Sequence, residues 1–242
     1  MTNASYVALA NQAALQRQLD VVANNLANAN TTGFKSSQLL FTQYLANVPN
    51  HDQQPIAFPQ DFGVERNFQE GAIGTTGNPL DLAIKGDAFF VVNTAAGQRY
   101  TGDGAFTLDA QGEIIDHSGD QVLDERGNPI VVPPNQSHVT ISDDGTISTE
   151  SGQLAHLALV RFDNPQQLKE ESAGIYDAQG AQSRPASGVK VVQGSLEGSN
   201  VEPVLEMTHL IEISRRYEQC QNMLNSEDDR QKKAIETLGS QA

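Results

Sequence analysis

The side chains of this sequence that could carry out chemistry are its histidines, its acidic loop residues and its single cysteine. The five histidines are far apart in the sequence, so no pair has the short spacing of zinc ligands, and a cluster could form only through the fold. The sequence contains no nucleophile elbow, phosphate-binding glycine loop or neighbouring Cys/His pair. It therefore predicts a protein without a catalytic residue, a metal site or a cofactor.

Acidic loop residues are the remaining candidates for binding a metal ion. Asp103, Asp143 and Asp144 lie next to or near a glycine, and their carboxylates could hold calcium. The sequence lacks, however, the calcium-binding loop of about twelve residues that ends in glutamate. Because Asp and Gly favour tight turns between strands for backbone reasons, we interpret these residues as turn formers.

Composition and charge exclude several classes of function. The 242 residues are 38% hydrophobic, enough for at least one modest core, and their formal net charge is −15. This charge would repel nucleic-acid phosphates. The first residues lack the basic and apolar regions of a secretory signal, and no apolar run is long enough to span a bilayer. We therefore expect a cytoplasmic protein, unless an export route recognises the intact N-terminus.

The N-terminal segment, residues 4–29, predicts a long helix. Its apolar residues recur at three- and four-residue spacing and therefore share one stripe; these are Leu15, Leu19, Val22 and Leu26. Before residue 35, the only charged side chains are Arg17 and Asp20. A helix with so few charges is expected to be covered on every face.

The C-terminal segment predicts a second long helix with one apolar stripe. The stripe residues again recur at three- and four-residue spacing; they are Leu210, Ile213, Tyr217, Cys220 and Leu224. Ser199 and Asn200 are expected to cap the start of this helix, with Pro203 tolerated in its first turn. Cys220 has no partner for an internal disulfide and is expected to pack as a small hydrophobic residue.

The region between the helices has the pattern of short strands joined by tight turns. Its apolar runs are separated by Gly, Asn and Asp; they are LDLAIKG, AFFVVN, AFTLD, VTIS and LALVRF. Residues 35–78 contain Pro49, Pro55 and Pro59 and show no sustained period. We therefore predict an extended connector over that stretch.

These segments predict an α+β fold in which the terminal helices pair as a coiled-coil stalk and an all-β domain is inserted between them. The predicted parts are the N-terminal helix of the stalk at 1–34, the extended connector at 35–78, the β-rich outer domain at 79–190, and the return segment with the C-terminal helix at 191–242. Two helices bury one seam, so copies of the same chain are expected to cover the rest. The alternative is a single domain whose end helices pack on the sheet, and the pattern alone does not decide between the two.

The stretch from Asn24 to Lys35, NNLANANTTGFK, is the most distinctive in the chain. Asn is unfavourable inside a helix and favourable at its end, so this stretch predicts a helix that stops at a specified place. Gly33 is expected to adopt a positive φ, and Phe34 to anchor the exit. Buried amides need hydrogen-bond partners, which suggests that these asparagines meet partner groups across helices.

NNLANANTTGFK closely resembles the signature of the flagellar rod and hook protein family, the axial proteins of the bacterial flagellum. Three further segments match that pattern: GAIGTTGNPLDLAIKGDAFFVV at 71–92, YTGDGAFTLDAQGEI at 100–114 and LEGSNVEPVLEMTHLIEISRRYEQCQNML at 196–224. Within the family, the chain is most similar to proximal rod proteins of the alphaproteobacterial type. It departs from the usual pattern at Ala88, where the family commonly has glycine, and in the charged tail after Asn225.

The resemblance implies a structural subunit of the proximal rod, which self-assembles into the periplasmic drive shaft that transmits motor torque to hook and filament. It implies copies of the chain and other flagellar rod proteins as partners, together with the flagellar type III export apparatus, which would export the chain without cleavage. It implies neither nucleic-acid binding nor a membrane span, and leaves contact with peptidoglycan open. Copy number, helical symmetry and direct neighbours are not predicted.

The resemblance also implies which residues form the assembly interface. These are Leu15, Leu19, Val22, Asn25 and Leu26 in the first helix, Asn28, Thr31, Thr32, Gly33 and Phe34 in the turn, and Met207, Leu210, Ile213, Tyr217 and Leu224 in the second helix. The alternative within the family is a distal rod or hook subunit. Alternatives from other classes are a secreted cell-wall hydrolase, which would need a pair of acidic residues in one cleft, and an adhesin that binds calcium or a sugar.

Overall fold

The computed structural model describes residues 3–46, 56–134, 136, 138–172 and 174–239. It has the predicted α+β composition, with one long helix toward each end and many short strands between them. Its contacts divide the chain into two compact units. Unit 1 contains residues 1–27, 37–65 and 202–242, and unit 2 contains residues 28–36 and 66–201.

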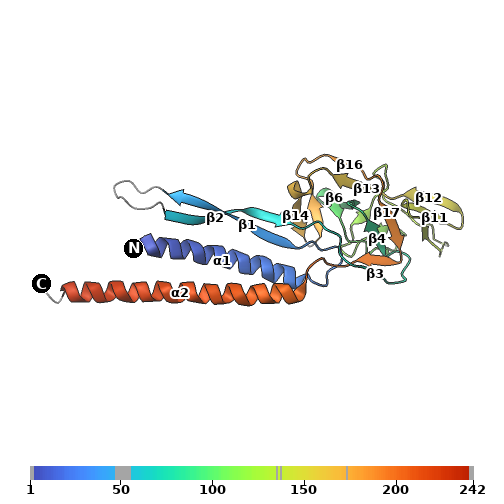
Figure 1. Ribbon diagram of the computed structural model, residues 1–242. Coiled ribbons are helices and arrows are strands. Elements are labelled where there is room, and N and C mark those ends of the chain that lie inside the picture. The colour runs from blue at the N-terminus through green and yellow to red at the C-terminus, as the bar shows by residue number, and fades with distance from the viewer. Residues whose placement is uncertain (1–2, 47–55, 135, 137, 173, 240–242) are drawn as a thin grey trace. The chain divides into compact units, whose positions relative to one another are not determined.

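Unit 1 consists of the two long helices and a two-stranded sheet. Helix α1 spans Asn3–Ala27 and helix α2 spans Pro203–Gly239 (Figure 1). Strands β1, Ser37–Ala46, and β2, Ile56–Arg66, pair with each other. Pro203 is the first residue of α2, where its fixed φ fits the helix and its missing N–H is not needed. The prediction of Pro203 in the first turn is therefore confirmed.

The strands β1 and β2 lie in the stretch that the sequence predicts as an extended connector, residues 35–78. Pro49 and Pro55 lie outside the described residues, and Pro59 falls inside β2. A two-stranded sheet consists only of edge strands, where a proline does not interrupt the ladder if its nitrogen faces away from the partner. Sequence analysis missed this sheet because it treated the prolines as breaks.

Unit 2 is built from short antiparallel strands. The largest sheet follows the order β14-β15-β6-β5-β9-β8-β7, and β13 joins it by pairing with β5 and β16. Smaller sheets are β10-β11-β12, β17-β4 and β18-β3. The bounds are β3 Ile73–Thr75, β4 Leu82–Lys85, β5 Phe89–Thr94, β6 Gly97–Thr101, β7 Thr107–Leu108, β8 Ile114–Ile115, β9 Gln121–Val122, β10 Thr140–Ile141, β11 Thr146–Thr149, β12 Gly152–His156, β13 Leu159–Phe162, the 3-10 helix η1 Pro165–Gln167, β14 Lys169–Ser172, β15 Ile175–Asp177, β16 Ser183–Pro185, β17 Lys190–Gln193 and β18 Ser195–Glu197. The five predicted apolar runs all form strands, namely β4, β5, β7, β10 and β13.

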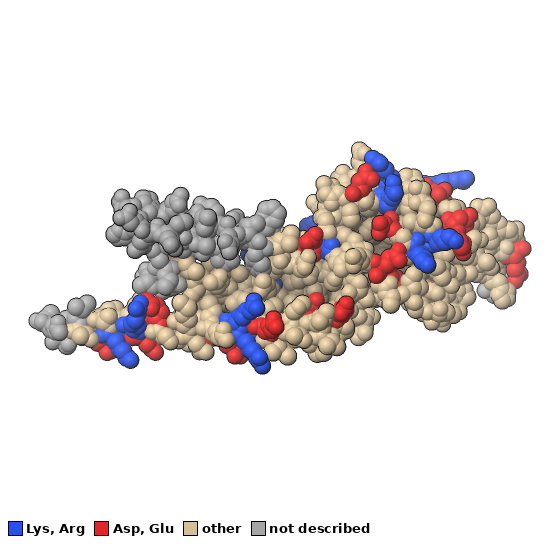
Figure 2. All heavy atoms as spheres, in the orientation of Figure 1, with Lys and Arg blue, Asp and Glu red and all other residues tan. Residues whose placement is uncertain are grey.

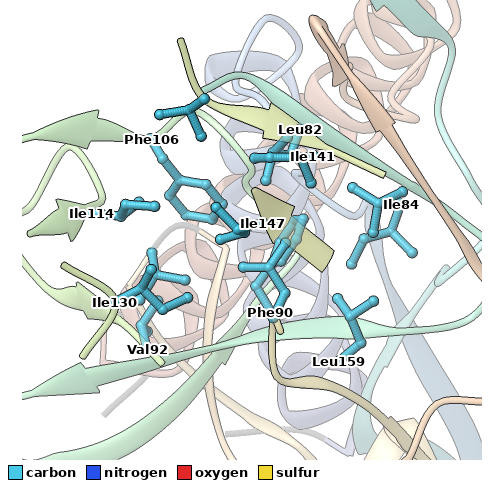
Figure 3. Close-up of a cluster of buried hydrophobic side chains, with 14 of the residues drawn as sticks. Leu82, Ile84, Phe90, Val92, Phe106, Ile114, Ile130, Ile141, Ile147 and Leu159 are labelled. Carbon is cyan, nitrogen blue, oxygen red and sulfur yellow. The ribbon is translucent and has the colours of Figure 1, made fainter. Parts of the chain in front are cut away.

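Strand β5 carries a hydrophobic core on each of its faces. Phe90 and Val92 belong to one cluster of buried side chains, and Phe89 and Val91 to another. Successive side chains of a strand point to opposite faces, so burial on both faces requires the uninterrupted apolar run of this strand. Figure 3 shows the first cluster, in which the rings of Phe90 and Phe106 meet edge to face with centroids 5.1 Å apart.

Three turns of unit 2 share one hydrogen-bond pattern. They begin at Asp109, Asp116 and Asp124, and in each the carboxylate Oδ1 accepts from the N–H groups two and four residues further on, over 2.7–2.9 Å. The glycine three residues after each aspartate has a φ of 79–88°, a conformation that favours glycine. The motif Asp-x-x-Gly is thus a repeated turn former, which the sequence analysis did not recognise as a repeat.

The acidic residues considered for calcium also hold turns. Oδ1 of Asp144 accepts the N–H of Thr146 at 2.9 Å, and Oδ1 of Asp103 accepts the N–H of Ala105 at 3.0 Å. Both are hydrogen bonds to the residue two positions further on, which is the geometry of an Asx turn. The interpretation of Asp103 and Asp144 as turn formers is therefore confirmed.

The surface of unit 2 carries charges of both signs. Arg99 pairs with Glu171 at 2.7 Å, and Arg184 pairs with Asp163 at 3.0 Å. On the face seen in Figure 2, acidic and basic side chains of this unit lie next to one another. The Arg184–Asp163 pair is exposed on both sides, and solvent screens such a pair, so it bears on solubility more than on stability.

Candidate functional site

The two helices of unit 1 lie side by side and antiparallel. Sγ of Cys220 donates to the carbonyl of Ala8 at 3.1 Å, and Nε2 of Gln12 donates to Oε1 of Gln221 at 2.6 Å. Val22, later in α1, instead lines a groove with the early α2 residues. Later residues of α1 therefore lie beside earlier residues of α2, so the two helices run in opposite directions, as Figure 1 also shows.

Most of the helix residues predicted for the assembly interface lie on covered faces. Val22 is buried on α1, with 9% of its surface exposed. The other apolar members are half-buried; they are Leu15, Leu19 and Leu26 on α1 and Leu210, Ile213, Tyr217 and Leu224 on α2. Met207 is placed differently, with 47% of its surface exposed. It lies on a side of α2 that the described residues leave open.

Both helices also carry apolar side chains that face outward. These residues are 47–71% exposed; they are Tyr6 and Leu9 on α1 and Val204, Leu205, Met207, Ile211, Met223 and Ile235 on α2. Large apolar side chains that cluster on a surface mark an interaction site. Sequence analysis missed most of them because it followed only one stripe per helix. The three- and four-residue spacing of Val204, Met207 and Ile211 would have revealed the second stripe on α2.

Asn25 is a buried amide of α1 that pairs with the backbone of β1. It is 2% exposed, its Nδ2 donates to the carbonyl of Ser37 at 2.8 Å, and its Oδ1 accepts the N–H of Ser37 at 2.9 Å. The side-chain amide thus supplies the two hydrogen bonds that a neighbouring strand would otherwise make to the backbone N–H and carbonyl of Ser37. The partner is the chain's own backbone, so no second helix is required to explain this asparagine.

The turn after α1 is held by its own side chains. The carbonyl of Asn28 accepts the N–H of Thr31 at 3.1 Å, and Oδ1 of Asn28 accepts the hydroxyl of Thr31 at the same distance. Thr32 is half-buried, and Phe34 is 1% exposed. The structure therefore places Phe34 as a buried anchor of unit 2, in agreement with the prediction.

Gly33 must be glycine for two independent reasons. Its φ is +67°, as predicted, and a Cβ at this position would lie 2.6 Å from the nitrogen of Asp103. Its N–H donates to the carbonyl of Glu197 at 2.8 Å. The turn is therefore packed directly against two other segments of unit 2.

A buried ion pair joins the first and last segments of unit 2. Nζ of Lys35 lies 2.6 Å from Oε1 of Glu197, and these side chains are 8% and 7% exposed. Nζ also donates to the carbonyl of Gln69 at 3.0 Å, and Oε1 accepts the N–H of Gly71 at 2.8 Å. We call Lys35, Glu197 and Gly71 the clasp. It ties together the places where the chain enters and leaves unit 2.

Asn200 completes the clasp region instead of capping a helix. Its Oδ1 accepts the N–H of Ser36 at 2.7 Å, and its Nδ2 donates to the carbonyls of Asn67 and Gln69 at 2.7 and 2.9 Å. The predicted cap is therefore wrong, because α2 begins three residues later, at Pro203. The amide is used to hold three backbone segments together.

A groove of about 290 Å³ opens between α1, β1 and α2 in unit 1. Its ionisable lining residues come from α2; they are Glu206, His209, Glu212 and Arg216. Oε2 of Glu206 is buried and has no hydrogen-bond partner among the described residues. A buried acceptor without a partner is costly, so the groove offers a position for a donor from outside the chain.

Asp103 and His117 form an acid–histidine contact of a kind that enzymes use. Nδ1 of His117 lies 3.3 Å from Oδ2 of Asp103. Burial raises the pKa of Asp103, while the N–H of Ala105 and the nearby His117 act in the opposite direction. The other carboxylate oxygen is used by its own turn, as described above. This geometry is explained by the turn and requires no substrate.

Two further findings limit the chemistry of the described residues. In the described ranges, His, Cys, Asp and Glu side chains form no group of three or more that could hold a metal ion. No helix in this part of the chain combines the length and the apolar character needed to cross a membrane.

Comparison with known proteins identifies relatives over the whole chain. Three family models match: "Flagella basal body rod protein" at residues 6–35, "Flagellar hook protein FlgE/F/G D1 domain" at 83–149 and "Flagellar basal body rod FlgEFG protein C-terminal" at 192–237. The flagellar basal-body rod protein FlgF of Caulobacter vibrioides is 40% identical over 242 residues, which cover 99% of each chain. FlgF of Mesorhizobium japonicum is 34% identical over 100% of both chains. The rod protein FlgG of Agrobacterium fabrum is 32% identical, covering 89% of this chain and 92% of its own.

Proposed function

Because the chain belongs to the FlgF family of flagellar basal-body rod proteins, it is a structural subunit of the rod, and we propose that α1 and α2 form a coiled-coil stalk through which it assembles. Neighbouring subunits would cover the outer faces of the helices. The rod would then transmit torque through interlocked helices, without making or breaking a covalent bond.

The observation that carries this proposal is the outward-facing apolar surface of the helix pair. Exposed residues such as Val204, at 71%, and Leu9, at 55%, lie on helices whose inner faces already pack together. A helix pair with apolar side chains on both its inner and its outer faces is suited to burial among several helices. The interface residues proposed from the family pattern, Met207 among them, would divide between the seam within one subunit and the contact with the next.

The remaining partners follow from family membership. The rod lies in the flagellar basal body, and we propose that the chain reaches the periplasm through the flagellar type III export apparatus. It would assemble with copies of itself and with other rod proteins. We also propose that the β strands of unit 2 contact peptidoglycan.

The proximal rod is favoured over the distal rod or hook. The FlgF relatives described above align with 99–100% of this chain, and the FlgG relative with 89%. Those relatives are named as rod proteins, so they give no support to the hydrolase and adhesin alternatives.

The proposal is tested by removing the gene and by examining isolated basal bodies. Cells without the chain are expected not to swim, and a plasmid copy is expected to restore swimming. Basal bodies purified from the restored cells should contain the full chain, detected by mass spectrometry, at a constant ratio to other rod proteins. Normal swimming without the gene, or basal bodies that lack the chain, would show the assignment to be wrong.

A further inference from the structure

We propose that the clasp carries mechanical load between the segment that follows α1 and the segment that precedes α2, so that force between the two ends of the chain bypasses most of unit 2. Three stretches of backbone meet at the clasp, residues 33–36, 67–72 and 197–200, and we call them the clasp segments. The proposed function supplies the source of the load, which is torque passing along the rod. The clasp itself can be tested in the isolated chain.

The first and last clasp segments run parallel to each other. The N–H of Gly33 donates to the carbonyl of Glu197 at 2.8 Å, and the carbonyl of Phe34 accepts the N–H of Asn200 at 3.3 Å. Further along, the N–H of Ser36 donates to Oδ1 of Asn200 at 2.7 Å. Residue numbers therefore increase in the same direction along both segments.

The middle clasp segment bonds to the other two and runs antiparallel to both. Asn67 donates its N–H to the carbonyl of Ser36 at 2.8 Å, and Nζ of Lys35 donates to the carbonyl of Gln69 at 3.0 Å. Strand β18, which ends at Glu197, pairs antiparallel with β3 at the end of the middle segment. The first and last segments are therefore held by each other and through a shared neighbour.

This arrangement places a load between the chain ends in shear. The N-terminal side pulls the first clasp segment toward its lower-numbered end, and the C-terminal side pulls the last one toward its higher-numbered end. Because the two segments are parallel, these pulls slide them past each other and load all of their hydrogen bonds at once. In antiparallel segments the same pulls would act at one end and break the bonds one after another. The parallel arrangement therefore needs more force to open than an antiparallel one with the same bonds.

The ion pair is the strongest single link between the first and last clasp segments. Nζ of Lys35 lies 2.6 Å from Oε1 of Glu197, and the two side chains are 8% and 7% exposed. A hydrogen bond between charged groups is roughly twice as strong as one between neutral groups, and a low local dielectric strengthens it further. While this link holds, residues 37–196 form a loop closed by the clasp and are spared most of the tension.

Pulling single molecules of the full chain tests this inference. Handles are fused to both ends, and each chain is held at constant force until it opens. Lys35→Met/Glu197→Met removes the ion pair without leaving a buried charge, and Asn200→Ala removes the side-chain bonds of that residue to the other two segments. Near-UV circular dichroism first confirms that each variant is folded. Both variants should shorten the lifetime of the closed chain by roughly tenfold or more, because forced unfolding follows the unfolding rate.

The matched control pulls the same variants along a path that avoids the clasp. Ala95 and Ser151 are exposed in the turns that follow β5 and β11. In a Cys220→Ser background, cysteines at these two positions carry the handles in place of the chain ends. Force then enters and leaves unit 2 between residues 95 and 151, outside all three clasp segments. Lys35→Met/Glu197→Met and Asn200→Ala should leave the lifetime nearly unchanged in this direction.

Three results would overturn the inference. The first is an unchanged lifetime of both variants under load between the chain ends. The second is equal shortening in both pulling directions, since the clasp would then be a general stabiliser of unit 2 and not the link that carries the load. The third is equal shortening by Lys190→Met, whose ion pair is exposed and lies outside the clasp. The rod assignment is independent of these results, because basal-body content and swimming test it separately.

Discussion

Replacing Leu19 or Leu210 by glutamate is expected to abolish swimming while unit 2 stays folded. Both leucines are half-buried, on α1 and α2 respectively. A carboxylate at either position would have to be taken from water without a partner, which costs several kcal/mol and opposes the packing of helices in the stalk. The measurement is expansion of a soft-agar colony by deletion cells that carry each variant.

Two controls separate this effect from general damage. Leu19→Met keeps the volume and apolar character of the side chain, and Gln219→Glu introduces the same charge at an exposed position of α2. Both are expected to support swimming. The near-UV circular dichroism of unit 2, which contains the buried Tyr100 and Tyr176, should be retained in all four variants. Normal swimming of Leu19→Glu or Leu210→Glu would contradict the stalk.

Lys35→Met is expected to destabilise unit 2 strongly. The substitution removes the ammonium that lies 2.6 Å from Glu197 and leaves a carboxylate that is 7% exposed. Breaking a buried pair from one side costs about 3–5 kcal/mol, because the remaining charge has lost its partner. For a unit of this size the melting temperature should fall by roughly 10 °C. Thermal unfolding followed by near-UV circular dichroism measures the shift.

The chain offers a matched control in a second lysine. Lys190 pairs with Asp143 at 3.5 Å, and these side chains are 67% and 78% exposed. Lys190→Met should therefore change the stability by no more than about 1 kcal/mol. The double variant Lys35→Met/Glu197→Met should recover part of the loss, because no unpaired charge remains buried. If the Lys35→Met and Lys190→Met variants have the same melting temperature, the clasp does not stabilise unit 2 as proposed.

The parts of the fold that the sequence predicts are those with a strong local pattern. The spacing of Leu15, Leu19 and Val22 identifies α1, and apolar runs such as Ala88–Val92 identify strands, although only the structure shows that β5 is buried on both faces. The Thr-Thr-Gly sequence places the positive φ at Gly33 correctly. In each case the residues that determine the structure are close together in the chain, so periodicity or turn chemistry is sufficient.

The parts that the sequence does not predict depend on contacts between distant segments. The clasp joins Lys35 to Glu197, and Asn200 bonds to residues near position 67, so neither partner is visible from its own neighbourhood. The pairing of β1 with β2 was hidden by prolines that an edge strand tolerates. The second stripe on α2, Val204, Met207 and Ile211, is different: its spacing is local, and it was missed because only one stripe per helix was followed. The residues of the assembly interface remain a prediction until a contact between copies is measured.

Hydrogen exchange, compared between the free full chain and the chain in isolated basal bodies, tests most directly whether the helices are covered in the rod. The account predicts that peptides covering residues 6–16 and 204–211 exchange quickly in the free chain and become strongly protected in basal bodies. Peptides from β5 should be protected in both states, because its residues 89–92 are buried within unit 2. Equal exchange of the helix peptides in the two states would contradict assembly through these helices.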